Sequence, residues 1–207
     1  MRKTLILAAM LAAAPVAASA DELSYTYVEA GSAQLQINNN ELNDPNLGGA
    51  YLRGSFDIAD KFNVFGGYSR ASKTYNLGHG EREKLLVGVS ELGAGFHMNL
   101  SERADFTADA AWMRLGSEYR LRGAGDDNYT DKEHTDAGRV TIGLRGTPFA
   151  RTEAWIKGGI VDGNRMSTEF VGVLGGQVKF NKTWGIVAEG QWLDDLAQYS
   201  LGVRASF

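Results

Sequence analysis

The chain has 207 residues, a formal net charge of −4, 43% hydrophobic and 22% charged residues, and no cysteine. This composition excludes a disordered chain, disulfide bonds and cysteine-ligated metal sites, and the acidic balance argues against a nucleic-acid-binding protein. No apolar run reaches the ~18 residues that a membrane-spanning helix needs, so a soluble protein and a transmembrane β-barrel both fit these numbers.

The first twenty residues match a secretory signal peptide. Arg2 and Lys3 form a positive segment, residues 5–14 are apolar, and Ala18-Ser19-Ala20 is a small-residue cleavage site. The alternative is a membrane-anchoring helix, which would need a longer apolar stretch. We therefore expect residues 1–20 to be a cleaved signal peptide and residues 21–207 to form one exported domain.

Apolar and polar residues alternate along the mature chain, a period of two that indicates half-buried β-strands. The pattern predicts ten strands, at residues 22–37, 46–58, 61–75, 83–100, 103–122, 134–147, 152–162, 168–180, 184–194 and 197–207. In the first strand, Glu29 interrupts the apolar face of Tyr25, Tyr27 and Leu35, and a bulge or a shift of phase would resolve this conflict. Eight strands are the alternative, if the first two are mispaired.

The connections between the predicted strands alternate in length. Short turns fall at residues 59–61, 101–102, 148–151 and 181–183, and longer polar loops at 38–45, 73–82, 122–134, 162–168 and 193–196. Short turns on one rim and longer loops on the other are typical of bacterial outer-membrane barrels. The sequence therefore predicts a closed antiparallel up-and-down transmembrane β-barrel, with both ends of the sheet at the periplasmic rim.

Aromatic residues at strand ends favour a membrane barrel over a soluble one, because amphipathic rings gather at headgroup depth. The predicted aromatic girdle consists of Phe106, Trp112, Phe170, Phe180, Trp184, Trp192 and Tyr199. In a soluble barrel the apolar face would point inward, and the period alone does not choose between the two orientations.

The opposite face of the strands carries six acidic and six basic residues. They are Arg53, Asp57, Glu91, Asp105, Asp109, Arg139, Arg145, Glu153, Lys157, Lys179, Glu189 and Arg204. In a membrane barrel they would lie inside, where equal numbers of opposite charges favour crosslinking salt bridges. We expect a plugged or very narrow, wet interior.

The last strand alternates as Tyr199-x-Leu201-x-Val203-x-Ala205-x-Phe207. This pattern resembles the C-terminal strand signature of outer-membrane proteins, and the resemblance implies recognition by the barrel-assembly machinery.

The histidines give little support to catalysis. His97 has no serine two positions away, as an outer-membrane lipid A deacylase would require. His134-x-Asp136, with Asp126-Asp127 nearby, superficially matches the paired acids and histidine of an omptin-like protease, and a solvated charged loop is the alternative. The acidic loop at 123–134 lacks the EF-hand register. We expect no catalytic residues, metal or cofactor.

Three stretches carry a family resemblance. They are Tyr25-x-Tyr27-Val28-Glu29-x-Gly31, Phe62-x-Val64-Phe65-Gly66-Gly67-Tyr68-Ser69 and Gln177-Val178-Lys179-Phe180-Asn181-x-x-Trp184-Gly185-Ile186. Together they resemble a family of small Gram-negative outer-membrane β-barrels, OmpA-like or porin-like, some of whose members carry a quorum-factor label. The chain departs from the family at Ala205-Ser206-Phe207, where relatives often end in Trp, and has a longer stretch around 116–134. The resemblance implies an exported barrel and supplies no catalytic residues.

These observations predict an outer-membrane barrel with a structural or surface-interaction role and outer loops that face the cell exterior. The expected partners are outer-membrane lipid, lipopolysaccharide and the barrel-assembly machinery, and the loops could also meet divalent cations or other cells. A small-solute channel is the alternative, and an enzyme that modifies lipid A or cleaves peptides is a third reading. The sequence leaves the oligomeric state open.

Overall fold

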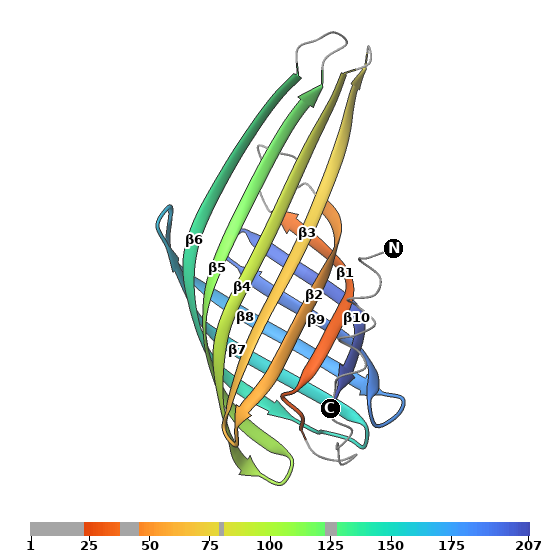
Figure 1. The fold of residues 1–207 in the computed structure, drawn as a ribbon, viewed down its shortest axis with the longest axis vertical. Helices are drawn as coiled ribbons and strands as arrows, with labels where there is room; N and C mark the ends of the chain where they lie inside the picture. The colour runs from red at the N-terminus through yellow and green to blue at the C-terminus, as the bar shows by residue number, and fades with distance from the viewer. Residues whose placement is uncertain (1–22, 38–45, 79–80, 123–127) are drawn as a thin grey trace.

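The computed structural model describes residues 23–37, 46–78, 81–122 and 128–207. Ten antiparallel strands form one sheet: β1 (Tyr27–Ile37), β2 (Asn46–Ala59), β3 (Phe62–Gly78), β4 (Glu81–Ser101), β5 (Ala104–Arg122), β6 (Asn128–Gly146), β7 (Thr152–Gly163), β8 (Met166–Lys179), β9 (Trp184–Leu193) and β10 (Leu196–Ser206). Each strand pairs with the next, and β10 pairs with β1, so the barrel is closed (Figure 1). The predicted ten-strand fold is confirmed, and the eight-strand alternative is wrong.

The predicted signal peptide at residues 1–20 lies outside the described residues. Within the described ranges, no helix has both the length and the apolar character needed to cross a membrane.

Four of the predicted loops are wholly or partly strand in the structure. The expected loop at residues 73–82 is the end of β3 and the start of β4, and the expected loop at 122–134 is largely the first part of β6. The expected loops at 162–168 and 193–196 shrink to two residues each. Above the membrane both faces of a sheet meet water, so a strand there needs no apolar alternation and reads as a loop in the sequence.

The strands are of very unequal length. β3 to β6 have 17, 21, 19 and 19 residues, whereas β7, β9 and β10 have 12, 10 and 11. About 9–11 residues suffice to cross a membrane, so β7, β9 and β10 do little more than cross it. The surplus in β3 to β6 amounts to roughly 25–30 Å of strand at ~3.3 Å per residue. It rises from one rim as a tall four-stranded sheet (Figure 1). We call residues 70–78, 81–90, 114–122 and 128–136 the extension.

The two rims of the barrel differ in their connections. The turns at residues 60–61, 102–103, 147–151 and 180–183 lie at the end opposite the extension, which we call the short-turn rim. Tyr27 pairs with Ser206 there, so β1 starts and β10 ends at the same rim. At the extended rim, Asp194 has a φ of 44°, the left-handed conformation that a two-residue hairpin requires.

The outer surface of the barrel is apolar and its interior is charged. Leu92, Leu174 and Val178 point outward and are 54–65% exposed, whereas Glu153 and Arg204 are almost fully buried inside. A soluble barrel would show the reverse. The orientation is therefore the one predicted for a barrel that faces lipid.

β1 fits this pattern without any irregularity. Tyr27, Glu29, Leu35 and Ile37 alternate with exposed residues and share the inner face, and the pairing of β1 with both neighbours shows no register shift. The predicted bulge at Glu29 is wrong. The strand starts at Tyr27 rather than at residue 22. Its charged and apolar inner residues share one face and lie at different depths along the lumen.

The lumen has two halves of different character. Charged inner residues lie toward the short-turn rim, and apolar ones toward the extended rim. One apolar cluster contains Met113, Ala137, Trp155, Val161, Val171, Val173, Val187 and Leu193, and a second contains Leu35, Leu47 and Ala71. Glycine makes room for the one tryptophan inside: a Cβ at Gly175, the cross-strand partner of Trp155, would collide with the indole ring.

Candidate functional site

The charged half of the lumen begins at the seam where the barrel closes. Arg204 on β10 donates to Oε2 of Glu29 on β1 at 2.6 Å, and Arg53 on β2 donates to Glu189 on β9 at 2.6 Å. The indole N–H of Trp155 donates to the second oxygen of Glu189 at 2.8 Å. Arg204 and Glu29 lie on neighbouring strands, whereas Arg53 and Glu189 lie on strands separated by β1 and β10, so the second pair bridges the seam on the inside of the barrel.

A second ionic group lies near the short-turn rim. Glu153 on β7 accepts a hydrogen bond from Arg145 on β6 and forms a salt bridge with Lys179 on β8, both at 2.5 Å. Arg145 also donates to the backbone carbonyl of Ser24 at 2.9 Å, and its guanidinium lies 4.6 Å from the centre of the Tyr25 ring. The segment that precedes β1 is thereby tied to the barrel wall.

Tyr25 fills the short-turn end of the lumen. Its hydroxyl donates to Asp105 at 2.9 Å, and its ring stacks on the imidazole of His97 at 3.8 Å between centroids. His97 in turn lies 3.7 Å from a carboxylate oxygen of Asp57. The side chain of Tyr25 therefore acts as a plug held by hydrogen bonding, stacking and a cation–π contact.

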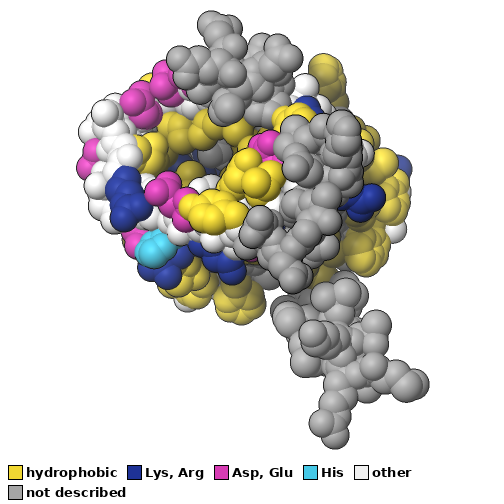
Figure 2. Space-filling model, turned by 90° about the horizontal axis from the view of Figure 1, so that it is seen from above, with side chains coloured by type: hydrophobic (Ala, Val, Ile, Leu, Met, Phe, Trp, Pro, Cys, Tyr) yellow, Lys and Arg dark blue, Asp and Glu magenta, His cyan; other side chains and the backbone are white. Residues whose placement is uncertain are grey.

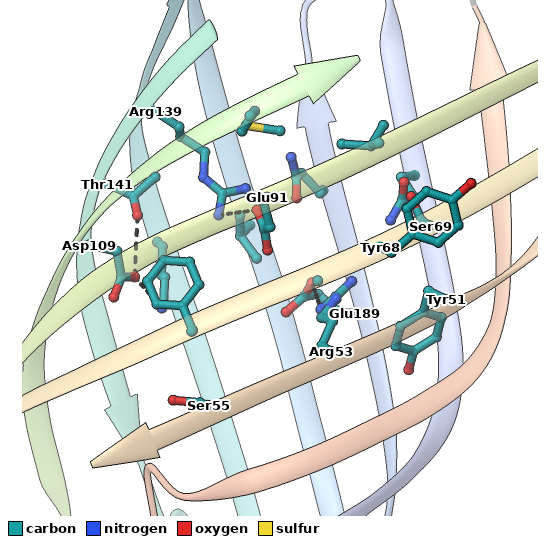
Figure 3. Close-up of a pocket in the computed structure, with 18 of the residues that line it drawn as sticks. Tyr51, Arg53, Ser55, Tyr68, Ser69, Glu91, Asp109, Arg139, Thr141 and Glu189 are labelled. Carbon is teal, nitrogen blue, oxygen red and sulfur yellow. Dashed lines mark hydrogen bonds and ion pairs between the residues drawn. The ribbon is translucent and has the colours of Figure 1, made fainter. Parts of the chain in front are cut away.

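Two further pairs lie at the level where the lumen turns apolar. Arg139 on β6 forms a salt bridge with Glu91 on β4 at 2.8 Å, and Lys157 on β7 contacts Asp109 on β5 at 2.5 Å. Figure 3 shows Arg139 and Glu91 pointing into the lumen from neighbouring walls. Thr141 donates to Asp109 at 3.4 Å, so this carboxylate has two partners.

All twelve predicted interior charges lie on the inner face. Ten of them form salt bridges with a side chain of opposite charge within 4 Å. The other two are Asp57, which contacts His97, and Asp105, which accepts a hydrogen bond from Tyr25. Sequence reasoning missed Glu29, which it treated as a break in an apolar face. With Glu29, the inner wall carries seven carboxylates against six basic side chains, and His97 lies beside them. The missed signal was the parity of Glu29 with Tyr25 and Tyr27, all of which lie inside.

A narrow cavity of about 180 Å³ runs along the lumen between these groups. Its lining extends from Tyr25 and Arg145 at one end to Leu35 and Leu196 at the other. At about 30 Å³ for each water, the space holds roughly six water molecules. Figure 2 views the molecule onto the extended rim and shows hydrophobic side chains around a central hollow.

The predicted girdle residues all point outward and form two levels. Phe106, Phe180 and Trp184 lie near the short-turn rim, and Trp112, Phe170, Trp192 and Tyr199 lie toward the extended rim. The rings of Trp192 and Tyr199 meet edge to face at 6.1 Å. Of the predicted assembly signal, Tyr199, Leu201 and Val203 are exposed on β10, Ala205 is buried and Phe207 follows the strand.

The outer face of the extension is strongly basic. Among the side chains that the structure describes there, six are basic and two are acidic: Arg70, Arg82, Lys84, Arg114, Arg120 and Lys132, with Glu118 and Asp136. We call this set the basic face. The inner face of the extension carries the opposite balance, with one basic and three acidic side chains: Lys73, Glu83, Asp131 and Glu133.

Glu118 is the centre of the basic face. Arg120 donates to it at 2.6 Å, Lys132 lies at 3.6 Å and Arg70 at 4.0 Å. The hydrogen bond from Arg120 holds the pKa of Glu118 below its ordinary value. Three cations share one carboxylate, so positive charge is left uncompensated on the outer surface of the sheet.

The described residues that were considered for catalysis do not form one cluster. His134 and Asp136 both lie on the outer face of β6, where Asp136 forms a bidentate pair with Arg114 at 2.8 and 3.1 Å. His97 is enclosed in the lumen, and Asp126-Asp127 lie outside the described residues. Within the described part of the chain, no group of acidic residues and histidines is arranged to hold a metal ion.

Comparison with solved structures assigns the architecture. The outer membrane protease OmpT from Escherichia coli aligns with a TM-score of 0.54 over 91% of this chain and 100% of its own, at 9% identity. Ail, the attachment invasion locus protein of Yersinia pestis solved with the heparin analogue sucrose octasulfate, aligns with a TM-score of 0.51 over 88% of this chain and 97% of its own, at 12% identity. The translocator domain of the autotransporter NalP from Neisseria meningitidis aligns with 0.51 over 88% of each chain, at 13% identity.

The fold is that of Gram-negative outer-membrane β-barrels. No family model matches the sequence, and no curated protein sequence matches it. The barrel fold and the apolar outer band support the predicted location in the outer membrane. The three similar structures are named for a protease, an attachment protein and a translocator, so the fold itself does not select a role.

Proposed function

We propose that this protein is a non-conducting, non-enzymatic barrel of the outer membrane that binds phosphate groups of lipopolysaccharide through the basic face of its extension. The observation that carries the proposal is the charge asymmetry of the extension. A wall that served only to lengthen the barrel would not need six basic side chains on its outer face and an acidic balance on its inner face.

The position of the basic face fits lipid recognition. Arg114 lies two residues beyond Trp112, a member of the girdle at headgroup depth, and Arg70 lies two residues beyond the exposed Tyr68. The basic residues therefore begin where the apolar band ends. In the outer leaflet this is the level at which lipopolysaccharide carries its phosphates.

The chemistry of the side chains also fits an anion. Arginine presents a planar fork that binds phosphate in a bidentate manner, and lysine adds a mobile point charge. The Ail structure contains a sulfated sugar, which is an anionic ligand of related chemistry. This similarity is an analogy at the level of the fold.

The experiment is a binding titration of the purified, folded protein with lipopolysaccharide before and after enzymatic removal of its phosphates. We expect tight binding only to the phosphorylated form. The variant Arg70→Gln/Arg120→Gln/Lys132→Gln should bind at least tenfold more weakly, because each charge-assisted hydrogen bond contributes about 1.5–3 kcal/mol.

The matched control removes three exposed cations from the opposite rim, in Arg103→Gln/Arg151→Gln/Lys182→Gln. It changes the net charge by the same amount and should leave binding unchanged. Equal binding of both lipid forms, or equal loss in the two triple variants, would refute a phosphate site on the extension. Binding of a dephosphorylated surface ligand would point instead to another cell-surface partner.

The small-solute channel is the competing function. The ion pairs Arg53–Glu189 and Arg139–Glu91 project into the lumen, and Tyr25 fills its short-turn end. These contacts support a closed interior, and conductance measurements described below distinguish the two functions.

A further inference from the structure

The apolar half of the lumen is the second feature of the molecule that suggests a ligand. Val171, Val187 and Val161 are fully or almost fully buried there, and Met113 and Leu193 pack with them. Val89, Leu115 and Leu196 add partly buried apolar surface to the same cluster. Met113, Leu115, Leu193 and Leu196 line the cavity, so these apolar side chains leave an open space between them at this level.

The size of the cavity limits what it can hold. The whole lumen, charged and apolar halves together, encloses about 180 Å³, so the apolar half holds at most a ligand of the size of benzene, which an apolar cavity of ~150 Å³ accepts. The lining runs lengthwise, from the ionic groups at one end to Leu35 and Leu196 at the extended rim. An elongated space of this volume fits a short linear chain better than a branched or fused-ring molecule.

The floor of the apolar half disfavours a charged ligand. Arg139 is paired with Glu91, Lys157 with Asp109, and Arg53 with Glu189. A ligand carrying a charge would have to separate one of these buried pairs or leave its own charge without a partner, and both are costly in a narrow lumen. The floor is therefore suited to an uncharged head group.

One donor at this floor lacks an acceptor. The Nε of Arg139 is buried and has no hydrogen-bond partner among the described residues, although its Nη2 binds Glu91. A buried donor on a charged side chain is expensive to leave unpaired. In Figure 3 the side chain of Arg139 projects into the lumen, so a ligand oxygen that lies in the cavity can reach this region.

We propose that the extended-rim half of the lumen binds one short, linear, uncharged amphiphile, with its alkyl chain against Met113, Val173 and Leu193 and a carbonyl-type oxygen accepting from Nε of Arg139. The ligand class is that of short-chain ketones and esters. This site is separate from the basic face and does not depend on lipopolysaccharide binding.

Trp155 provides a direct readout, because it is the one tryptophan inside the lumen and also lines the cavity. In the variant Trp112→Phe/Trp184→Phe/Trp192→Phe, Trp155 is the only remaining tryptophan. This protein, folded in lipid nanodiscs, is titrated with a short-chain methyl ketone that carries a terminal bromine, which quenches tryptophan on contact. We expect saturable quenching with the ketone and none with the carboxylate of the same chain length.

Two further variants locate the ligand. Val173→Phe in the same background fills the cavity and should abolish quenching, while Val178→Phe, on the exposed outer face of the same strand, should not. Arg139→Lys keeps the charge but removes Nε, and should weaken ketone binding roughly tenfold. Folding of each variant is verified by a heat-induced shift on a gel, and Leu193→Phe replaces Val173→Phe if the latter does not fold.

Several outcomes would overturn the proposal. Quenching that rises linearly without saturation, or that persists in Val173→Phe, shows partition into lipid rather than a site. Tighter binding of the carboxylate contradicts the uncharged head group. Unchanged affinity in Arg139→Lys refutes the assigned orientation of the carbonyl.

Discussion

Arg204 and Glu29 lie directly opposite each other across the seam between the last strand and the first, and their side chains form a hydrogen-bonded pair at 2.6 Å. Both side chains are buried, and the guanidinium also lies over the ring of Tyr27 at 4.0 Å. The seam that closes the barrel is therefore held on its inner side by a buried pair of opposite charges.

We predict that breaking this pair weakens the barrel more than removing it. Arg204→Met leaves Glu29 with only the distant Arg53 and should reduce the free energy of unfolding by about 3–5 kcal/mol. The double variant Glu29→Met/Arg204→Met should recover most of that loss. Urea unfolding in lipid vesicles measures both, and Arg70→Met, an exposed charge on the extension, serves as the control. A double variant no more stable than Arg204→Met would contradict this view of the seam.

The orientation of the barrel gives a second prediction. Leu174→Arg places a charge near the middle of the lipid-facing band and should cost about 2–4 kcal/mol of unfolding free energy in a bilayer. Phe149→Arg changes an equally apolar residue to the same charge in a short turn, where it meets water, and should cost little. Equal costs for the two variants would be incompatible with a lipid-facing Leu174.

Conductance is the third prediction. In planar bilayers we expect no steady openings of the wild-type protein, because paired charged side chains fill the lumen at several levels and Tyr25 fills its short-turn end. Tyr25→Ala/Arg53→Ala/Glu189→Ala removes the tyrosine plug and both members of one pair, keeps the charge balance and should produce measurable current. Steady, ion-selective openings of the unmodified protein would establish the channel alternative and end the proposal of a closed interior.

The titration of Glu118 is the fourth prediction. Because Arg120 lowers its pKa, the pairs around Glu118 stabilise the extension fully above the ordinary pKa of a glutamate and lose this contribution as the pH falls through the lowered value. NMR titration of the carboxyl carbon should place the pKa below that of a free glutamate, and Arg120→Gln should raise it. An identical pKa in the two proteins would show that Arg120 does not contact Glu118 in solution.

The alternation of side chains was sufficient to predict the strands that cross the membrane, since each residue there faces either lipid or lumen. The segments at residues 73–82 and 122–134 could not be recognised in the same way, because Arg82 and Lys132 stand on the outer face where an apolar residue would otherwise mark the outer side. Their strand structure depends on pairing with neighbouring strands, such as Lys132 with Glu118.

The interior was only half predictable. Charged positions such as Arg145 and Glu153 follow from parity alone, but their partners depend on register and on the diameter of the barrel. Along β5 the inner residues change from Asp105 and Asp109 to Met113. A local pattern does not reveal this change, because apolar residues that face inward look the same in the sequence as those that face outward. The role of Tyr25 could not be read from the sequence, since it precedes the first strand and depends on contacts with β4, β5 and β6.

The inequality of the strands has a consequence for access. The tall sheet of β3 to β6 screens the mouth of the lumen on one flank, while β7 to β10 end close to the bilayer surface on the other (Figure 1). A molecule that dissolves in the outer leaflet can thus approach the hollow sideways over the low flank, without first leaving the membrane for bulk water.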